Sequence, residues 1–346
     1  MNEYLIRVSL DYPSLSLTEF RSLVLKYSSS RDRIFPIRRY GKFYYVRTNI
    51  SEEDIKKIVK ESATLKTVYL IVKKFHITHM DESYQSDLLQ AAKELVDRYC
   101  IKSFRIYNFA KDNIFSEKLV SVLNSNIPLY ERNQYTKDIL AIFVTDNLLF
   151  FTKMIYKDKK DFVHRTPSKR PVFSPSSLHP KLARLLVNLS RLGGDQSKII
   201  VDPFCGVGGV LIEASLLQYE NIGIDIERKW IFGAKQNLAW IDSNITYSHL
   251  IIGDACNPPL RKVACIVTDP PYGRITSTHG RTATTIYEKF LSSFYKILSK
   301  NSTLVFISPS GLKVKSRNDY LYKELEKHII PVHGSLTRII NIWRRM

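Results

Sequence analysis

Residues 199–209 read Ile-Ile-Val-Asp-Pro-Phe-Cys-Gly-Val-Gly-Gly, and this stretch decides the fold. An apolar strand that ends at Val201 turns through closely spaced glycines into a helix over Gly209–Gln218. The same alternation continues with a strand at Asn221–Ile224, a helix at Trp230–Ala239, and strands at His249–Ile252 and Ala264–Thr268. Apolar strands that alternate with helices predict a parallel sheet with helices on both faces, a doubly wound α/β domain.

The N-terminal part has a different order of elements. Strands are expected at Tyr4–Leu10, Arg33–Ile37, Lys42–Arg47 and Thr67–Phe75, with helices at Ser16–Tyr27 and after Ser51. The resulting β-α-β-β-α-β order is the split βαβ arrangement of α+β domains. A second small unit follows, with helices at Gln85–Tyr99 and Ser116–Leu123 and strands at Phe104–Phe109, Asp138–Val144 and Leu148–Ile155.

Residues 151–175 interrupt this pattern. They hold seven basic and two acidic side chains up to residue 170, and they contain prolines at 167, 171 and 175. Such a composition is typical of a basic linker or hinge loop. We therefore expect four parts: a ferredoxin-like domain at 1–70, a second N-terminal domain at 71–155, a linker at 156–172, and the α/β domain at 173–346.

Composition limits the classes of function. The 346 residues carry a formal charge of +19, and both halves of the chain are basic. A positive charge of this size, spread over both halves of the chain, favours a polyanionic partner such as a nucleic acid. The four cysteines show no metal-ligand spacing, and the N-terminus lacks the apolar core of a signal peptide. We expect a cytoplasmic protein with no membrane segment and no bound metal.

The glycine turn and two later aspartates indicate a nucleoside cofactor. Gly206 and Gly208 allow a ligand to approach the backbone closely. Asp225 ends the next strand, where a carboxylate can accept both hydroxyls of a ribose, and Asp254 ends the third strand, where it can meet an adenine amino group. The loop lacks the third glycine of a dinucleotide-binding turn. Its acidic character suits the sulfonium and ammonium groups of S-adenosylmethionine.

The fourth strand leads into Asp269-Pro270-Pro271-Tyr272-Gly273. An exocyclic amino nitrogen of a base is a poor nucleophile because its lone pair is delocalised into the ring. Asp269 and the carbonyl of Pro270 can each accept one amino hydrogen and so direct the lone pair at a methyl group. Tyr272 offers a ring on which the base can stack. This pattern predicts transfer of a methyl group to an amino nitrogen.

At these motifs the sequence resembles a known family. Asp269–Gly273 looks like motif IV of the amino-methyltransferases, and Asp202–Gly209 looks like their motif I. Together with Arg165–Arg184, GIDIE, GDA and VHGSLTR, they are similar to archaeal tRNA guanosine-10 N2-methyltransferases. The resemblance implies a Rossmann-like methyltransferase domain, preceded by a ferredoxin-like piece and a THUMP RNA-binding domain. It also implies that S-adenosylmethionine is the cofactor and that a guanosine of tRNA, at position 10, receives one or two methyl groups.

The resemblance assigns roles to particular residues. Asp269 and Tyr272 hold the target base, beside the carbonyl of Pro270 already named as an acceptor, and Ser177–Arg184 cover the cofactor. The residues expected to bind the cofactor itself are Asp202, Pro203, Phe204, Cys205, Gly206, Gly208, Asp225, Ile226, Asp254 and Ala255. From their charge and place in or beside the linker and the later loop, we expect RNA contacts from Lys153, Lys157, Lys159, Lys160, Arg165 and Arg274.

Several alternatives remain open at this point. The chain could methylate guanine N2 at another tRNA site or in rRNA, or it could be a DNA adenine-N6 or cytosine-N4 methyltransferase with the same Asp-Pro-Pro-Tyr chemistry. It could also be a non-catalytic RNA-binding subunit that has kept the fold. The sequence does not decide between one and two methylations, nor whether a small activator protein is needed, as occurs for eukaryotic relatives.

Overall fold

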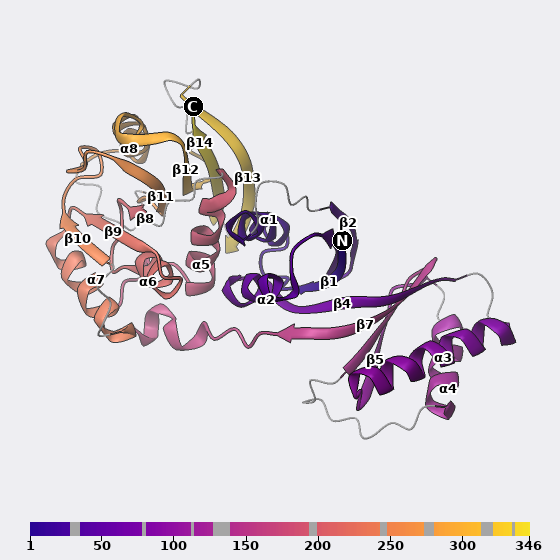
Figure 1. The fold of residues 1–346 in the computed structure, drawn as a ribbon. Helices are drawn as coiled ribbons and strands as arrows, with labels where there is room; N and C mark the ends of the chain where they lie inside the picture. Colours follow the sequence, from indigo (N-terminus) through magenta and orange to yellow (C-terminus); the bar gives the residue numbers. More distant parts are fainter. Residues whose placement is uncertain are drawn as a thin grey trace. The chain divides into compact units, whose positions relative to one another are not determined.

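The structure is a computed structural model that describes residues 1–27, 35–77, 81–111, 114–126, 139–193, 199–242, 248–272, 280–312, 321–333 and 336–346. The chain divides into two compact units. The first comprises Met1–Leu10, Ser29–Lys60 and Leu65–Lys159, and the second comprises Asp11–Ser28, Glu61–Thr64 and Lys160–Met346. Each unit is built on one seven-stranded sheet (Figure 1).

The first sheet has the strand order β2-β3-β1-β4-β7-β6-β5. Its strands are β1 (Asn2–Val8), β2 (Phe35–Tyr40), β3 (Phe43–Thr48), β4 (Leu65–His76), β5 (Ser103–Asn108), β6 (Ile139–Val144) and β7 (Leu148–Lys157). The helices along this part of the chain are α1 (Ser16–Tyr27), α2 (Glu52–Glu61), α3 (Glu82–Tyr99) and α4 (Ile114–Asn126). The order β1-α1-β2-β3-α2-β4 is the one predicted. Strand β4 pairs antiparallel with both β1 and β7 and so joins the two predicted N-terminal parts into one sheet.

The second sheet has the order β10-β9-β8-β11-β12-β14-β13. Its strands are β8 (Ile199–Asp202), β9 (Glu220–Asp225), β10 (Ser248–Ile252), β11 (Val263–Thr268), β12 (Leu298–Pro309), β13 (Tyr322–His333) and β14 (Leu336–Arg345). The first five of these are parallel, and β14 and β13 add an antiparallel edge. This is the predicted Rossmann-like sheet.

Helices cover both faces of the second sheet. Successive side chains along a strand point to opposite faces, so apolar residues in an unbroken run need a covering layer on each face. On one face, Cys265 and Val267 pack in a core with α5 (Pro180–Leu189) and α6 (Gly209–Leu216). On the other face, Ile266 packs with α8 (Ala283–Ile297). Helix α7 (Arg228–Ile241) packs against α6. None of the helices within the described ranges has the length and apolar composition that a bilayer crossing requires.

The strand order reverses between β8 and β11, which are hydrogen-bonded neighbours. Successive strands β8, β9 and β10 run outward in one direction, whereas β11 and β12 run outward in the other. In open parallel sheets this reversal leaves a crevice at the carboxyl ends of the two strands, because the connecting helices lie on opposite faces. The glycine turn after β8 and Asp269 after β11 therefore lie at the position where such folds bind ligands.

Part of the N-terminal chain belongs to the second unit. Helix α1 packs on α5, and residues Glu61–Thr64 accompany it. The fully buried carboxylate of Glu19 in α1 accepts hydrogen bonds from Ser62, from the backbone of Ala63 and from Asn188 in α5. The α/β unit thus includes helix α1 and the four residues 61–64, which the sequence-based division had assigned to the N-terminal part.

Candidate active site

A cavity of about 1190 Å³ lies at the carboxyl ends of β8, β9 and β11, and all of its lining residues belong to the second unit. It brings together the motifs that the sequence analysis singled out. All the predicted catalytic and cofactor residues except Gly208 line it: Asp202, Pro203, Phe204, Cys205, Gly206, Asp225, Ile226, Asp254, Ala255, Asp269, Pro270 and Tyr272. Residues up to 70 positions apart in the sequence therefore share one site, and their individual roles remain predictions.

The glycine turn lines the part of the cavity next to β8. The N–H of Cys205 donates to the carbonyl of Ile224 at 2.9 Å, which fixes the turn to the neighbouring strand. Gly206 and Gly208 both have positive φ, +50° and +84°, a conformation that costs side-chain-bearing residues free energy. A β-carbon on Gly208 would lie 3.2 Å from Cβ of Ala234 in α7. Gly208, the N-cap of α6, thus lets α7 approach closely, and it is not among the residues that line the cavity.

Asp225 receives two backbone hydrogen bonds at the end of β9. Its Oδ2 accepts from the N–H of Gly206 at 3.0 Å, and its Oδ1 accepts from the N–H of Glu227 at 2.9 Å. These bonds orient the carboxylate beside the glycine turn. Ile226 next to it is 43% exposed although it is apolar, and Trp230 of α7 also lines the cavity. An aspartate beside exposed apolar side chains suits a ribose and an adenine, and Trp230 was not identified from the sequence.

Asp254 follows β10 and is held in the same way. Its Oδ1 accepts from the N–H of Cys256 at 2.8 Å, and its Oδ2 forms an ion pair with Arg281 at 2.8 Å. Burial raises the pKa of Asp254, but these hydrogen bonds and the positive charge of Arg281 outweigh it, so the pKa is lower than usual. The group is therefore a carboxylate at neutral pH and can accept a hydrogen bond from an amino group.

Asp202 ends β8 and is only 2% exposed. Its Oδ1 accepts a hydrogen bond from the hydroxyl of Thr268 at 2.6 Å, which links the ends of β8 and β11, and another from the N–H of Phe204 at 3.2 Å. Burial raises the pKa of Asp202 to about 7, and the nearby carboxylate of Asp269 adds to the effect. Asp202 thus changes charge near neutral pH at the boundary between the two motifs.

Asp269 and Tyr272 form a pair after β11. The hydroxyl of Tyr272 donates a hydrogen bond to Oδ1 of Asp269. Burial raises the pKa of Asp269 to about 6, against the positive charge of Arg338 and the Tyr272 hydrogen bond, which both lower it. Above this pH Asp269 is a carboxylate whose remaining lone pairs can accept an amino hydrogen. Gly273, which ends the motif, lies outside the described residues.

Two residues near this pair were not identified from the sequence. The buried hydroxyl of Tyr287 in α8 donates to the carbonyl of Ile307 at 2.9 Å and lies 3.5 Å from the carbonyl of Pro270. Arg338 of β14 lines the cavity. Neither residue belongs to the Asp-Pro-Pro-Tyr motif that follows the fourth parallel strand. Helix α8 brings Tyr287 to the site, and the antiparallel strand β14 brings Arg338. Only Arg338 had a signal, as the last letter of the resembling string VHGSLTR.

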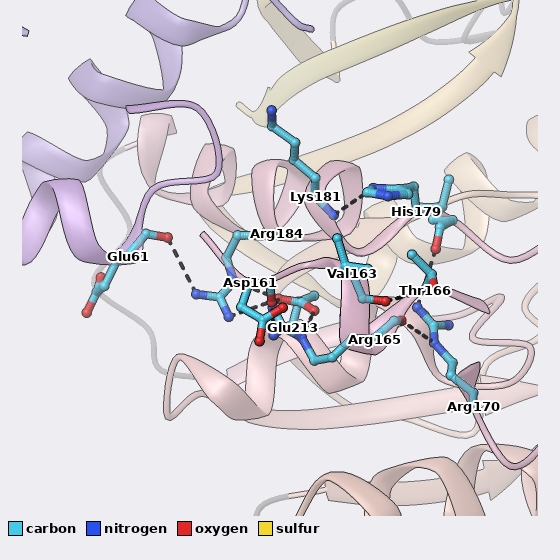
Figure 2. Close-up of polar contacts among 11 residues, drawn as sticks. Glu61, Asp161, Val163, Arg165, Thr166, Arg170, His179, Lys181, Arg184 and Glu213 are labelled. Carbon is cyan, nitrogen blue, oxygen red and sulfur yellow. Dashed lines mark hydrogen bonds and ion pairs between the residues drawn. The ribbon is translucent and has the colours of Figure 1, made fainter. Parts of the chain in front are cut away.

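Behind the glycine turn, a buried charge cluster holds helix α6. Figure 2 shows Glu213 of α6, which is fully buried, between Arg165 and Arg184. Nε of Arg165 lies 2.9 Å from Oε1 of Glu213, and Nη2 of Arg184 lies 2.9 Å from Oε2. Arg170 donates from Nε to the carbonyl of Arg165 at 3.1 Å. These contacts attach part of the predicted linker to the second unit.

The residues predicted to bind RNA lie in different surroundings. Lys153 and Lys157 are on β7 of the first unit, where Nζ of Lys153 lies 4.4 Å from the centre of the Tyr99 ring. Lys159 is exposed at the end of that unit, and Lys160 begins the next part of the second. Arg165 is paired with Glu213, and Arg274 lies outside the described residues. Contact of these residues with RNA remains a prediction.

The doubly wound sheet, the glycine turn after β8 and the Asp-Pro-Pro-Tyr turn after β11 are the features of a Rossmann-like methyltransferase. Residues 167–339, half of the chain, match the family model described as "RMKL-like, methyltransferase domain". The chain belongs to this family of methyltransferases, and a methyltransferase domain of this kind implies S-adenosylmethionine as the methyl donor.

Three similar proteins illustrate the relationship. A tRNA (guanine(10)-N2)-dimethyltransferase of Methanothermobacter thermautotrophicus is 37% identical over 210 residues, which cover 60% of this chain and 61% of that protein. One of Methanocaldococcus jannaschii is 32% identical and covers 60% and 58%. The chain thus spans about three fifths of these relatives. The crystal structure of TrmN from Thermus thermophilus, 14% identical, has a TM-score of 0.58 over 99% of this chain and 100% of that one, which supports the fold alone.

Proposed function

We propose that this protein transfers one or two methyl groups from S-adenosylmethionine to the exocyclic N2 of a guanosine in tRNA, at position 10. One observation carries the proposal: Asp269 and Tyr272 line the same cavity as the three carboxylates that follow β8, β9 and β10. The archaeal relatives are named for guanine 10 and its N2 atom, which supports this choice of target over another RNA site or DNA.

The residues of the cavity fit this cofactor. Asp225 would accept the ribose hydroxyls, Asp254 the adenine amino group, and the turn Asp202–Gly206 would hold the methionine part. Asp269 above about pH 6, and Asp202 above about pH 7, give this end the negative charge that suits the sulfonium and ammonium groups. When bound, the cofactor supplies an electrophilic methyl group on a positively charged sulfur. A volume of about 1190 Å³ exceeds the range of about 300–1,000 Å³ that is usual for one ligand, so it can also admit a base.

Asp269 and its neighbours would prepare the amino group. The carboxylate accepts one amino hydrogen and the carbonyl of Pro270 accepts the other, which turns the lone pair of the nitrogen toward the methyl group. Tyr272 would contribute a ring for stacking, while its hydroxyl keeps Asp269 oriented. The guanine amino group is paired inside a stem, so the nucleotide must leave the stem at a cost of a few kcal/mol.

Contacts of the protein with the tRNA body would offset this cost. We assign that role to the first unit, as a THUMP-type RNA-binding module, with Lys153, Lys157 and Lys159 at its surface. We also assign the protein to the cytoplasm, where it would meet its tRNA substrate. An assay of the chain without any added protein shows whether an activator subunit is needed.

The test is methyl transfer from labelled S-adenosylmethionine to tRNA, rRNA and DNA side by side. We expect label in tRNA alone, and its loss when guanosine 10 is replaced by adenosine. Label in DNA alone, or in rRNA alone, would overturn the choice of substrate. Tight binding of tRNA without transfer, with and without cell extract, would instead identify a non-catalytic RNA-binding subunit.

The proposal also predicts a dependence on pH. Asp269 must be a carboxylate, and its pKa is raised to about 6. Below that value the ionised fraction falls about tenfold for each pH unit, and the single-turnover rate should fall with it. Rates are to be measured from pH 5 to 8 at saturating cofactor, because Asp202 also titrates near pH 7. A rate that stays constant down to pH 5 would contradict the role of Asp269.

A further inference from the structure

Arg338 has no role in the proposed function, yet it lies in the same cavity. It is on the antiparallel strand β14, opposite Pro309 of β12. The carbon of its guanidinium lies 5.7 Å from the centre of the Tyr272 ring, within the range of a cation–π contact. Together with the hydrogen bond from Tyr272 to Asp269, this contact makes a row of three side chains: cation, aromatic ring and carboxylate.

A purely structural ion pair does not account for the position of Arg338 in the cavity. In the described part of the chain, Nε of Arg338 is buried without a hydrogen-bond partner. A buried guanidinium nitrogen without a partner costs free energy. Arg344 on the same strand has one too, so what distinguishes Arg338 is its place in the cavity and its contact with the Tyr272 ring. Arg281, in contrast, is another cation lining the cavity and is paired with Asp254.

The surroundings of Asp269 show what Arg338 contributes. Four ionisable side chains act on or lie beside it in the described part of the chain: Asp202 from β8, Tyr272 from its own loop, Tyr287 from α8 and Arg338 from β14. Asp202 is acidic, and both tyrosines are neutral near pH 7. Arg338 is therefore the positive charge in this group, and it counteracts burial, which favours the protonated form of Asp269.

We propose that Arg338 is a positioning residue that lies against Tyr272 and keeps Asp269 in the carboxylate form that accepts the amino hydrogen. This inference rests on the proposed function for its purpose, but the effect on Asp269 exists in the protein without substrate. It follows that the ionisation of Asp269 depends on the positive charge at position 338 more than on the shape of the guanidinium group. A lysine at this position should preserve most of the effect, whereas a neutral side chain should remove it.

The experiment follows the carboxyl carbon of Asp269 by NMR. The full chain is labelled with carbon-13 at the aspartate carboxyl groups, and the Asp269 signal is assigned by its absence in Asp269→Asn. Titration midpoints are compared for the unchanged chain, Arg338→Lys, Arg338→Met and Arg338→Gln. Arg344→Met is the matched control, since Arg344 is on the same strand and also has a buried Nε without a partner, but does not line the cavity.

We expect a midpoint near pH 6 in the unchanged chain, in Arg338→Lys and in Arg344→Met. In Arg338→Met and Arg338→Gln it should rise by roughly one unit. Single-turnover methyl transfer should then fall about fivefold at pH 6 and hardly at pH 8.5, because the ionised fraction of Asp269 changes in that way. Arg338→Gln serves if Arg338→Met fails to fold.

An unchanged midpoint in both neutral variants would overturn the inference, whatever the rates show. So would an equal shift in Arg344→Met, since it would mean that any positive charge on β14 has this effect. If the midpoint moves as expected but the unchanged chain methylates no nucleic acid, the proposed function fails and the influence of Arg338 on Asp269 remains.

Discussion

Asp269→Asn is expected to lower the rate of methyl transfer about 10³-fold, or about 4 kcal/mol in activation free energy, while cofactor affinity changes less than about twofold. The amide keeps the size of the side chain and can still accept from Tyr272. It lacks the negative charge that draws an amino hydrogen, and its NH₂ group repels one. Single-turnover rates with labelled cofactor, and calorimetric binding of S-adenosylhomocysteine, measure the two effects separately.

Stability distinguishes a catalytic effect from misfolding. The pKa of Asp269 in the folded protein is raised to about 6, so the folded state binds this proton more tightly than the unfolded chain does. Its contribution to stability is therefore lost as pH rises between about 4 and 6, and Asp269→Asn should unfold at a temperature no lower than the unchanged chain at pH 8. Asp242→Asn, an exposed control, should keep full activity. A melting temperature several degrees lower for Asp269→Asn would contradict this.

Glu19→Ala is expected to lower the free energy of unfolding of the second unit by about 3–5 kcal/mol. The carboxylate is fully buried and accepts five hydrogen bonds of 2.5–2.9 Å, from Ser62, Ala63, Thr64 and Asn188. Alanine would remove the acceptor of all five bonds and open a cavity between α1 and α5. The N–H of Thr64 and the amide of Asn188 would keep their second acceptors, Ser62 and the carbonyl of Glu61. Urea unfolding followed by tryptophan fluorescence measures the loss, because Trp230, Trp240 and Trp343 all belong to this unit.

Two control variants provide comparisons for the loss of stability in Glu19→Ala. Glu19→Gln keeps an oxygen acceptor and the volume of the side chain, so it should lose less than Glu19→Ala. Glu53→Ala removes an exposed glutamate whose partner is Lys56, and exposed pairs of this kind contribute at most about 1 kcal/mol. If Glu19→Ala changed stability no more than Glu53→Ala does, helix α1 would not be the integral part of the methyltransferase unit that the structure indicates.

Much of the fold could be predicted from local patterns. Alternating and apolar runs marked the parallel strands, and the structure confirms helix α1 at Ser16–Tyr27 without change. The turns after β8 and β11 were recognisable because glycine and proline restrict the backbone in characteristic ways. Parallel topology then placed Asp202, Asp225 and Asp269 at one edge of a sheet, and the structure brings them to one cavity.

The features that were missed depend on contacts between distant parts of the chain. Glu19 gave no local sign that it would meet Asn188, about 170 positions later, and so the sequence placed helix α1 with the N-terminal domain. Tyr287 and Arg338 reach the site through helix α8 and an antiparallel edge strand, whose pairing has no signature in a short window. Arg165 appeared to be a free basic residue of a linker because its acidic partner, Glu213, is far away in the sequence.

The identity of the methylated atom tests the central claim most directly. Transfer RNA incubated with the chain and S-adenosylmethionine is digested to nucleosides, which are separated and identified by mass spectrometry against standards. The account predicts N2-methylguanosine or N2,N2-dimethylguanosine, and neither product with Asp269→Asn. Methylation at a ring carbon, a ring nitrogen or a ribose hydroxyl would contradict it, because a carboxylate and a carbonyl that accept two amino hydrogens have no function in those reactions.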